Sequence, residues 1–166
     1  MVVIGIDPGT ATTGYGLVKE NPDGSLAVVD YGVILTPADK PMPERLLELY
    51  RRLLDIILLH RPESGAVEKL FFARNVTTAL SVGQGRGVAM LALAQAGLTV
   101  GEYAPMEIKQ AIAGYGGADK NQIQQMVRAL LGLAEIPRPD DAADALAVAI
   151  CHVHSARIQS LYREEE

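Results

Sequence analysis

The stretch Val2-Val3-Ile4-Gly5-Ile6-Asp7-Pro8-Gly9-Thr10 decides the fold. Its first five residues are apolar and largely β-branched, which is typical of a buried strand. Asp7 stands at the end of this strand, and the Pro8-Gly9-Thr10 segment turns the chain back. An acid at the end of a buried strand makes Asp7 the first candidate site residue.

Other carboxylates repeat this placement later in the chain. Ala66-Val67-Glu68 ends a second apolar run, and Asp141 and Asp144 stand at the start of an apolar helix. Gathering so many carboxylates is costly unless positive charge lies between them, and a pair of divalent cations is the simplest candidate. If the strand ends and the helix start converge, Asp7, Glu68, Asp141 and Asp144 supply the oxygen ligands that Mg²⁺ prefers. Two such ions about 4 Å apart can activate a water and stabilise the departing oxygen in phosphodiester cleavage.

Spacing alone leaves the choice between Asp140 and Asp141 open. Both lie on the same helical face as Asp144, Asp141 at i, i+3 and Asp140 at i, i+4. Capping favours Asp141 as the site residue. Pro139 disfavours a helical conformation at Arg138, and Asp140 suits the N-cap position, which leaves Asp141 in the first turn, pointing outward. The simpler alternative is that these acids only serve the helix N-terminus and that Asp7 is a turn residue.

Length, composition and charge describe one globular domain. The chain has 166 residues, of which 49% are hydrophobic, and a net charge of −5. We expect one domain over residues 1–162 and a disordered acidic tail over 163–166. No stretch is long and apolar enough to span a membrane. The lack of a secretion signal and the single cysteine, Cys151, predict a cytoplasmic protein. Because the net charge is negative, any surface that binds a polyanion must be a local patch.

The rest of the sequence alternates strand and helix patterns. Residues 12–18 suit an antiparallel neighbour of the first strand, and the turn signal Asn21-Pro22-Asp23-Gly24 predicts a third strand over 25–35. Apolar residues at helical spacing predict a helix that Arg61-Pro62 ends. The expected elements are strands over 2–7, 12–18, 25–35, 65–68 and 98–103, and helices over 43–60, 75–96, 105–112, 119–132 and 141–161. This order predicts an α/β fold whose mixed five-stranded sheet combines an antiparallel meander with parallel strands and is flanked by helices.

The acidic segments resemble those of a known family. Gly5-Ile6-Asp7-Pro8-Gly9, Ala66-Val67-Glu68 and residues 141–147 are similar to the three acidic motifs of RuvC, the bacterial Holliday-junction resolvase family. The resemblance extends in order from residue 2 to about residue 155. Further similar segments are 83–87, 103–105, 108–110 and 118–120.

The resemblance implies a fold, an activity and a set of partners. The fold would be RNase-H-like, and the activity would be Mg²⁺-dependent, symmetrical nicking of four-way junction DNA by a homodimer, as in homologous recombination and DNA repair. The metal ligands by this match are Asp7, Glu68, Asp141 and Asp144. They would hold two Mg²⁺ ions per subunit, with Mn²⁺ as a possible substitute. RuvA and RuvB are the partner proteins that the family suggests.

Basic and aromatic residues near these motifs are candidates for contact with DNA. Lys109 and Lys120 bracket a glycine-rich loop, and the resemblance implies roles for both in DNA binding and catalysis, with Lys120 named as the catalytic candidate and the relative importance of the two left open. An ammonium beside the scissile phosphate would offset developing negative charge. By the resemblance, Phe71 would be the ring that faces DNA, where it would stack on or wedge between opened bases. Arg74 and Arg86, with Arg128, are candidates to extend a positive stripe for phosphates, although a solvated surface position is the favoured interpretation for all three.

Small residues predict an interface between subunits. Ala79, Gly83 and Gly87 recur at i, i+4 and give a helix one thin face. Each glycine costs a helix about 1 kcal/mol relative to alanine, which implies a compensating close contact. Packing within the subunit is the alternative, but a two-fold interface suits a substrate that is itself nearly two-fold symmetric.

Three other functions are weighed against a nuclease. A zinc site at Cys151-His152-Val153-His154 is disfavoured, because these side chains share one helical turn and cannot converge on one ion. A non-cleaving scaffold that binds junctions would have less need of all four acids. An actin-like nucleotide-binding domain would explain the loop after Asp7, but that architecture needs two such domains. His152 is expected to border the site without binding metal.

Overall fold

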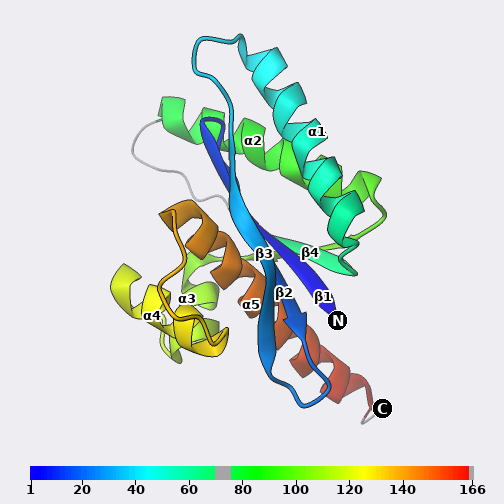
Figure 1. Ribbon diagram of the computed structural model, residues 1–166, viewed down its shortest axis with the longest axis vertical. Coiled ribbons are helices and arrows are strands. Elements are labelled where there is room, and N and C mark those ends of the chain that lie inside the picture. Colours follow the sequence, from blue (N-terminus) through cyan, green and yellow to red (C-terminus); the bar gives the residue numbers. More distant parts are fainter. Residues whose placement is uncertain (70–75, 165–166) are drawn as a thin grey trace.

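The computed structural model describes residues 1–69 and 76–164, with side chains as far as residue 159. One mixed sheet forms the centre of the molecule, with the strand order β3-β2-β1-β4-β5 (Figure 1). Its strands are β1 (Val2–Asp7), β2 (Thr12–Glu20), β3 (Leu26–Leu35), β4 (Ser64–Glu68) and β5 (Thr99–Tyr103). The first three strands form the antiparallel meander, and β1, β4 and β5 run parallel to one another.

The parallel pairing of β1 and β4 decides where two of the acids lie. Ile6 is paired with Val67, so Asp7 and Glu68 follow at the same end of two neighbouring strands. The carboxyl ends of parallel strands share one edge of a sheet, which is where open α/β sheets place their ligands. The topology therefore brings together two acids that are 61 positions apart in the sequence.

Helices cover both faces of this sheet. The helices α1 (Met42–His60) and α2 (Val76–Gln95) lie on one face, and α3 (Pro105–Ala113), α4 (Lys120–Leu130) and α5 (Asp140–Glu164) lie on the other (Figure 1). Alternate side chains of β1 serve the two layers: Ile4 and Ile6 pack with α1 and α2, whereas Val3 packs on the side of α5. Two apolar cores thus stabilise the sheet, as expected for a central strand buried on both faces.

Glycines allow α5 to lie directly on the backbone of β1 and β2. A Cβ atom added at Gly5 would stand 2.2 Å from the carbonyl oxygen of Ala145, and one added at Gly14 would stand 1.9 Å from that of Asp141. Gly16 makes a similar approach to Leu146. No side chain fits in these spaces, so the glycines set the distance between helix and sheet. That distance in turn fixes the position of the acids at the start of α5.

The predicted elements are confirmed, with small differences at their ends. The longest extension is at α5, which continues to Glu164. The N-cap assignment of Asp140 is wrong. The carbonyl of Pro139 accepts hydrogen bonds from the N–H groups of Ala142 and Ala143, at 3.0 and 3.3 Å. Asp140 is therefore the first residue of the helix, and its side chain is available for other contacts.

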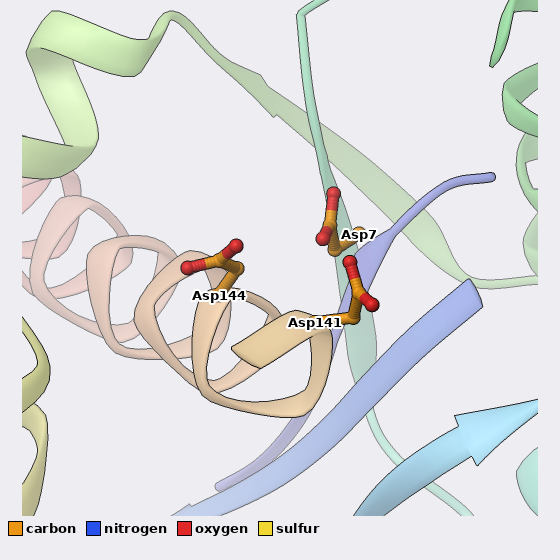
Figure 2. Close-up of side chains that lie close together, drawn as sticks. All are labelled: Asp7, Asp141 and Asp144. Atoms are coloured by element: carbon orange, nitrogen blue, oxygen red, sulfur yellow. The ribbon is translucent and has the colours of Figure 1, made fainter. Parts of the chain in front are cut away.

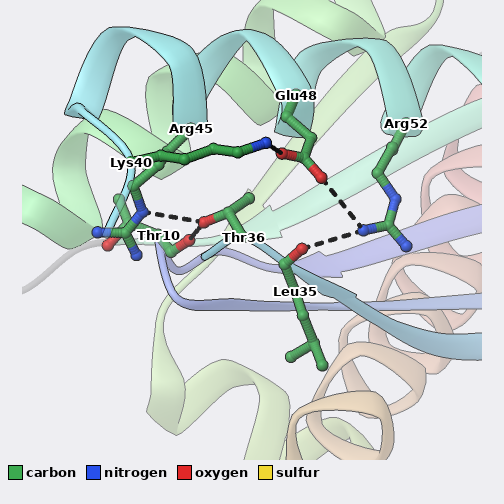
Figure 3. A network of polar contacts seen from close by, with 7 residues as sticks. All are labelled: Thr10, Leu35, Thr36, Lys40, Arg45, Glu48 and Arg52. Carbon is green, nitrogen blue, oxygen red and sulfur yellow. Dashed lines mark hydrogen bonds and ion pairs between the residues drawn. The ribbon is translucent and has the colours of Figure 1, made fainter. Parts of the chain in front are cut away.

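A polar network fixes the turn that follows Asp7 (Figure 3). The hydroxyl of Thr36 donates to the carbonyl of Thr10 and accepts from Nε of Arg45 in α1, at 3.1 Å for the second bond. The hydroxyls of Thr10 and Ser81 lie 2.5 Å apart and connect the same turn to α2. The chain that leaves Asp7 is thus held to both helices of this layer.

Within residues 1–69 and 76–164, no helix combines the length and apolarity needed to cross a bilayer.

Replacing Gly5 by alanine is expected to push α5 away from β1. Because the new Cβ would collide with backbone rather than with a flexible side chain, overpacking should lower the free energy of unfolding by about 1–3 kcal/mol. Chemical denaturation measures this change. Gly117→Ala is the matched control, since its Cβ would meet only the ring of Tyr115 at an ordinary 3.6 Å. Equal stability of Gly5→Ala and the wild type would contradict the close approach.

Candidate functional site

Three carboxylates converge where β1 ends and α5 begins. Asp7, Asp141 and Asp144 each offer a carboxylate oxygen, and these oxygens all lie within 4.8 Å of one another. Figure 2 shows Asp7 reaching from the end of its strand toward the two aspartates, which project from successive turns of the helix. Each of the three side chains is partly buried. Carboxylate oxygens at this spacing suit a hard divalent cation such as Mg²⁺.

Glu68 lies beside this cluster without being part of the tight group of three. It lines two adjoining pockets, one of about 240 Å³ with Lys109, Lys120 and Asp144, and one of about 230 Å³ with Asp7. Its charge also acts on Asp7, and the charge of Asp144 acts on it. Glu68 thus stands between the cluster and the lysines, at the point where the two pockets meet.

Burial and neighbouring charges raise the pKa of several acids in and beside the cluster. Burial, followed by the charges of Asp144, Asp141 and Glu68, raises the pKa of Asp7 to about 8. Burial is also the main cause of the raised pKa of Glu68 and of Asp144. The folded protein thus favours either protons or cations at this site. Such a shift is typical of functional sites, and a bound cation would favour the ionised carboxylates.

Two lysines lie on the other side of the same pocket. Lys109 in α3 lowers the pKa of Glu68 through its charge, opposing the effect of burial. Lys120 is the first residue of α4, and its ammonium lies 3.0 Å from Asp140 and 4.0 Å from Asp144. The hydrogen bond to Asp140 and the charge of Asp144 raise the pKa of Lys120, which therefore stays charged. Both lysines thus supply positive charge at the edge of an acidic pocket.

Arg86 holds the end of β4 instead of lying on a solvated surface. Its side chain is 18% exposed, and its guanidinium forms an ion pair with Glu102. Its Nε also donates a 3.0 Å hydrogen bond to the carbonyl oxygen of Glu68. The solvated position considered from the sequence is therefore wrong, because the guanidinium is used inside the protein. Its assigned contact with DNA stays a prediction.

The remaining candidate residues have varied outcomes. Phe71 and Arg74 lie outside the described residues, so the predictions for them stay open. Arg128 is half-buried and reaches the carbonyl of Ala134 at 3.4 Å. His152 does not line either pocket at the acidic cluster. It is buried, with ring nitrogens 2.7 Å from the hydroxyl of Tyr103 and 3.0 Å from that of Ser64.

The predicted small-residue face does not form one continuous exposed surface. Ala79 is buried in the subunit, Gly83 is half-buried, and Gly87 is exposed with nothing within 4 Å of its Cβ position. Each i, i+4 step advances about 40° around a helix, so the three residues turn from the core toward the surface. One line of exposed residues along α2 instead includes Val76, Leu80, Gln84, Gly87 and Leu91. These five residues are called the α2 stripe below.

Some of the residues that shape the site were missed at the sequence level. Gly14 and Gly16 stand at alternate positions of one strand, Gly5 interrupts the apolar run of another, and alanines recur in α5 between Ala142 and Ala149. Together these patterns are the signal of a helix packed closely on a sheet. The pair of Arg86 with Glu102 left no such signal, because its partners come from α2 and β5.

A mixed five-stranded sheet with carboxylates gathered at the ends of its central strands defines the class of RNase H-like nucleases. The family model for "Crossover junction endodeoxyribonuclease RuvC" matches residues 3–152. The chain belongs to the RuvC family.

Individual relatives agree with this assignment. The crossover junction endodeoxyribonuclease RuvC of Chloroflexus aurantiacus is 64% identical over 156 residues, which cover 94% of each chain. The structure of Thermus thermophilus RuvC superposes with a TM-score of 0.90 at 41% identity, over 96% of this chain and 97% of the other. The structure of T. thermophilus RuvC in complex with a Holliday junction substrate superposes with a TM-score of 0.87 at 39% identity, over 95% and 96% of the two chains.

The raised pKa of Asp7 predicts how stability depends on pH when divalent metal is absent. An acid whose pKa rises from 3.8 to about 8 on folding binds its proton more tightly in the folded state. Its contribution to stability is therefore present at pH 4 and is lost as the pH rises toward 8. Asp7→Asn should flatten this slope and stabilise the metal-free protein at pH 8 by roughly 1–3 kcal/mol, the scale of one or two pKa units.

Urea denaturation in the presence of a chelator, from pH 5 to 8.5, measures this dependence. Asp39→Asn is the control, because Asp39 is an exposed acid in the loop before α1. An unchanged slope in Asp7→Asn would show that burial and the neighbouring carboxylates do not raise the pKa of Asp7 as the structure requires.

Proposed function

We propose that this protein is a structure-selective endodeoxyribonuclease that resolves four-way DNA junctions by paired, symmetrical nicks. The observation that carries the proposal is the convergence of Asp7, Asp141 and Asp144, in a chain that belongs to the RuvC family. A junction would be recognised by shape and symmetry more than by a long base sequence. This activity would serve homologous recombination and DNA repair.

Asp7, Glu68, Asp141 and Asp144 are the proposed ligands of two Mg²⁺ ions, with Mn²⁺ as a possible substitute. The donor set supports the proposal, because it consists only of carboxylate oxygens, which these hard cations prefer. When bound, the pair of ions would supply activation of the attacking water and stabilisation of the departing oxygen. Arg86 supports the site indirectly, because its hydrogen bond to the carbonyl oxygen of Glu68 fixes the backbone of that residue.

Lys109 and Lys120 are proposed to act on the substrate itself. They line the pocket of about 240 Å³ together with Glu68 and Asp144. A scissile phosphate that enters this pocket would lie close to their ammonium groups, which offset its charge. The same groups stabilise the negative charge that develops on phosphate oxygens during cleavage.

A homodimer is the proposed active assembly. The α2 stripe leaves Val76, Leu80 and Leu91 exposed by 79, 63 and 57%, which is unusual for aligned apolar side chains on one helix. A second copy packed on this stripe would be related by a two-fold axis, as a junction cut at two equivalent strands requires. RuvA and RuvB, which the family resemblance suggests, remain proposed partners.

Asp7→Asn is expected to abolish nicking while junction binding survives. The substitution removes a proposed metal ligand but also a negative charge that repels DNA. The rate of nicking of a labelled four-way junction in Mg²⁺ should fall at least about 10³-fold, comparable to other losses of central electrostatic stabilisation. The wild-type protein with a chelator should be equally inactive. Asp39→Asn is again the matched control.

Two results would contradict the assignment. Full nicking activity of Asp7→Asn would show that the carboxylate cluster takes no part in the reaction. Binding of the junction by the wild-type protein without any nicking, in Mg²⁺ or Mn²⁺, would favour a non-cleaving scaffold.

Leu80→Glu and Leu91→Glu are expected to convert the dimer into monomers. Each places a charge where two apolar helices would meet, and desolvation of an unpaired charge is costly. Light scattering after size-exclusion chromatography measures the mass, and a cruciform plasmid distinguishes paired cuts from single nicks. Leu58→Glu is the control, because Leu58 is equally exposed, at 68%, but lies on α1. If these variants remain dimeric, the interface between subunits does not lie on the α2 stripe.

A further inference from the structure

Asp140 stands next to the acidic cluster in the sequence but turns to a different partner. It is the first residue of α5, and its carboxylate is directed at α4 instead of at Asp7. One oxygen, Oδ2, lies 3.0 Å from the ammonium of Lys120, and the other, Oδ1, accepts a 3.1 Å hydrogen bond from Nε2 of Gln124. Lys120 and Gln124 are one helical turn apart, so a single carboxylate binds two neighbouring side chains of α4.

Lys120 needs such a partner if it is to act at a defined place. Its side chain is 57% exposed, and a lysine has a long, flexible stem whose ammonium otherwise moves freely in solvent. In the structure the ammonium lies between Asp140 at 3.0 Å and Asp144 at 4.0 Å. It therefore reaches the edge of the pocket that Glu68 and Asp144 line.

The two carboxylates around Lys120 differ once cations occupy the cluster. Asp144 is a proposed metal ligand, so its negative charge would be offset by the bound ions, which also repel an ammonium. Asp140 is not one of the three acids whose oxygens lie within 4.8 Å of one another. Its charge stays available to Lys120. An exposed ion pair of this kind contributes little to the stability of the folded protein, so its main effect is on the position of the ammonium.

We infer that Asp140 is a positioning residue for Lys120: it holds the ammonium at the edge of the pocket where the scissile phosphate enters. This inference deepens the proposed function and rests on it, since it assigns a role within the same reaction. Asp140 does not itself touch the reacting atoms. It acts through Lys120, and Gln124 fixes the carboxylate by binding its second oxygen.

A double-mutant cycle tests this role directly. Single-turnover nicking of a four-way junction in Mg²⁺ is measured at saturating protein for the wild type, Asp140→Ala, Lys120→Ala and the double variant. Asp140→Ala should lower the rate about threefold to tenfold, and Lys120→Ala about 10²-fold. The double variant should be no slower than Lys120→Ala alone, because without the ammonium there is nothing left to position.

Further measurements separate positioning from a loss of folding. The dissociation constant for the junction, measured in Ca²⁺, should not weaken in Asp140→Ala, since the substitution removes a negative charge near DNA. Asp140→Asn keeps one oxygen acceptor for Lys120 but loses the charge and the second oxygen that accepts from Gln124, so its rate should lie between those of the wild type and Asp140→Ala. Glu135→Ala is the matched control: it removes another exposed carboxylate, from the connection between α4 and α5, and should leave the rate unchanged.

The outcomes distinguish this inference from the proposed function. If the wild type nicks but the two single effects multiply in the double variant, Asp140 does not act through Lys120 and the inference is overturned. A rate for Asp140→Ala within twofold of the wild type would overturn it as well. A wild-type protein that does not nick junctions would instead overturn the proposed function.

Discussion

The close contact between the backbone of α5 and the strands β1 and β2 is the constraint on which the rest of the structure depends. Gly5, Gly14 and Gly16 leave no room for side chains beneath the helix, and Ala142, Ala145 and Ala149 are fully buried. The acids at the start of the helix are short and cannot compensate for a distant backbone. Only a helix that lies this near to the sheet brings Asp141 and Asp144 within reach of Asp7. Packing and chemistry are thus set by the same contact.

This contact creates an electrostatic cost that the apolar cores must offset. Burial and mutual repulsion raise the pKa of Asp7, Glu68 and Asp144, and the pKa of about 8 at Asp7 favours its protonated form at neutral pH when metal is absent. Arg86 and the network around Thr36 keep the two strand ends in place despite this repulsion. Sites that bind ligands commonly lower the stability of the folded protein in this way, because their residues serve function and not local structural preference. Divalent cations would remove the cost at the moment when they make the site competent.

Much of this arrangement was predictable from the sequence, because the signals were local. The strand that ends at Asp7, the strand that ends at Glu68 and the apolar helix after Pro139 each have their own hydrophobic pattern, and the sheet follows from their order. Parallel neighbours then bring Asp7 and Glu68 to the same edge. Spacing left the choice between Asp140 and Asp141 open, and both the capping argument and the resemblance to the RuvC family favoured Asp141.

The rest depended on contacts between distant segments. The N-cap prediction for Asp140 was wrong, because the choice between capping a helix and pairing with Lys120 is decided by where α4 lies. Arg86 was expected on a solvated face, since the sequence does not show that Glu102 and the end of β4 lie beside it. The predicted interface of Ala79, Gly83 and Gly87 assumed that residues at i, i+4 spacing share one helical face, but each such step turns about 40° around the helix axis. The errors at Asp140 and Arg86 each concern a side chain whose partner comes from another element.

A crystal structure of the protein soaked with Mn²⁺, with anomalous scattering used to locate the ions, tests the central claim most directly. The account predicts anomalous peaks within about 2.3 Å of carboxylate oxygens of Asp7 and of Asp141 or Asp144, with α5 still in contact with Gly5 and Gly14. Anomalous peaks found only at other acids, with the oxygens of Asp7 bound to no ion, would contradict it.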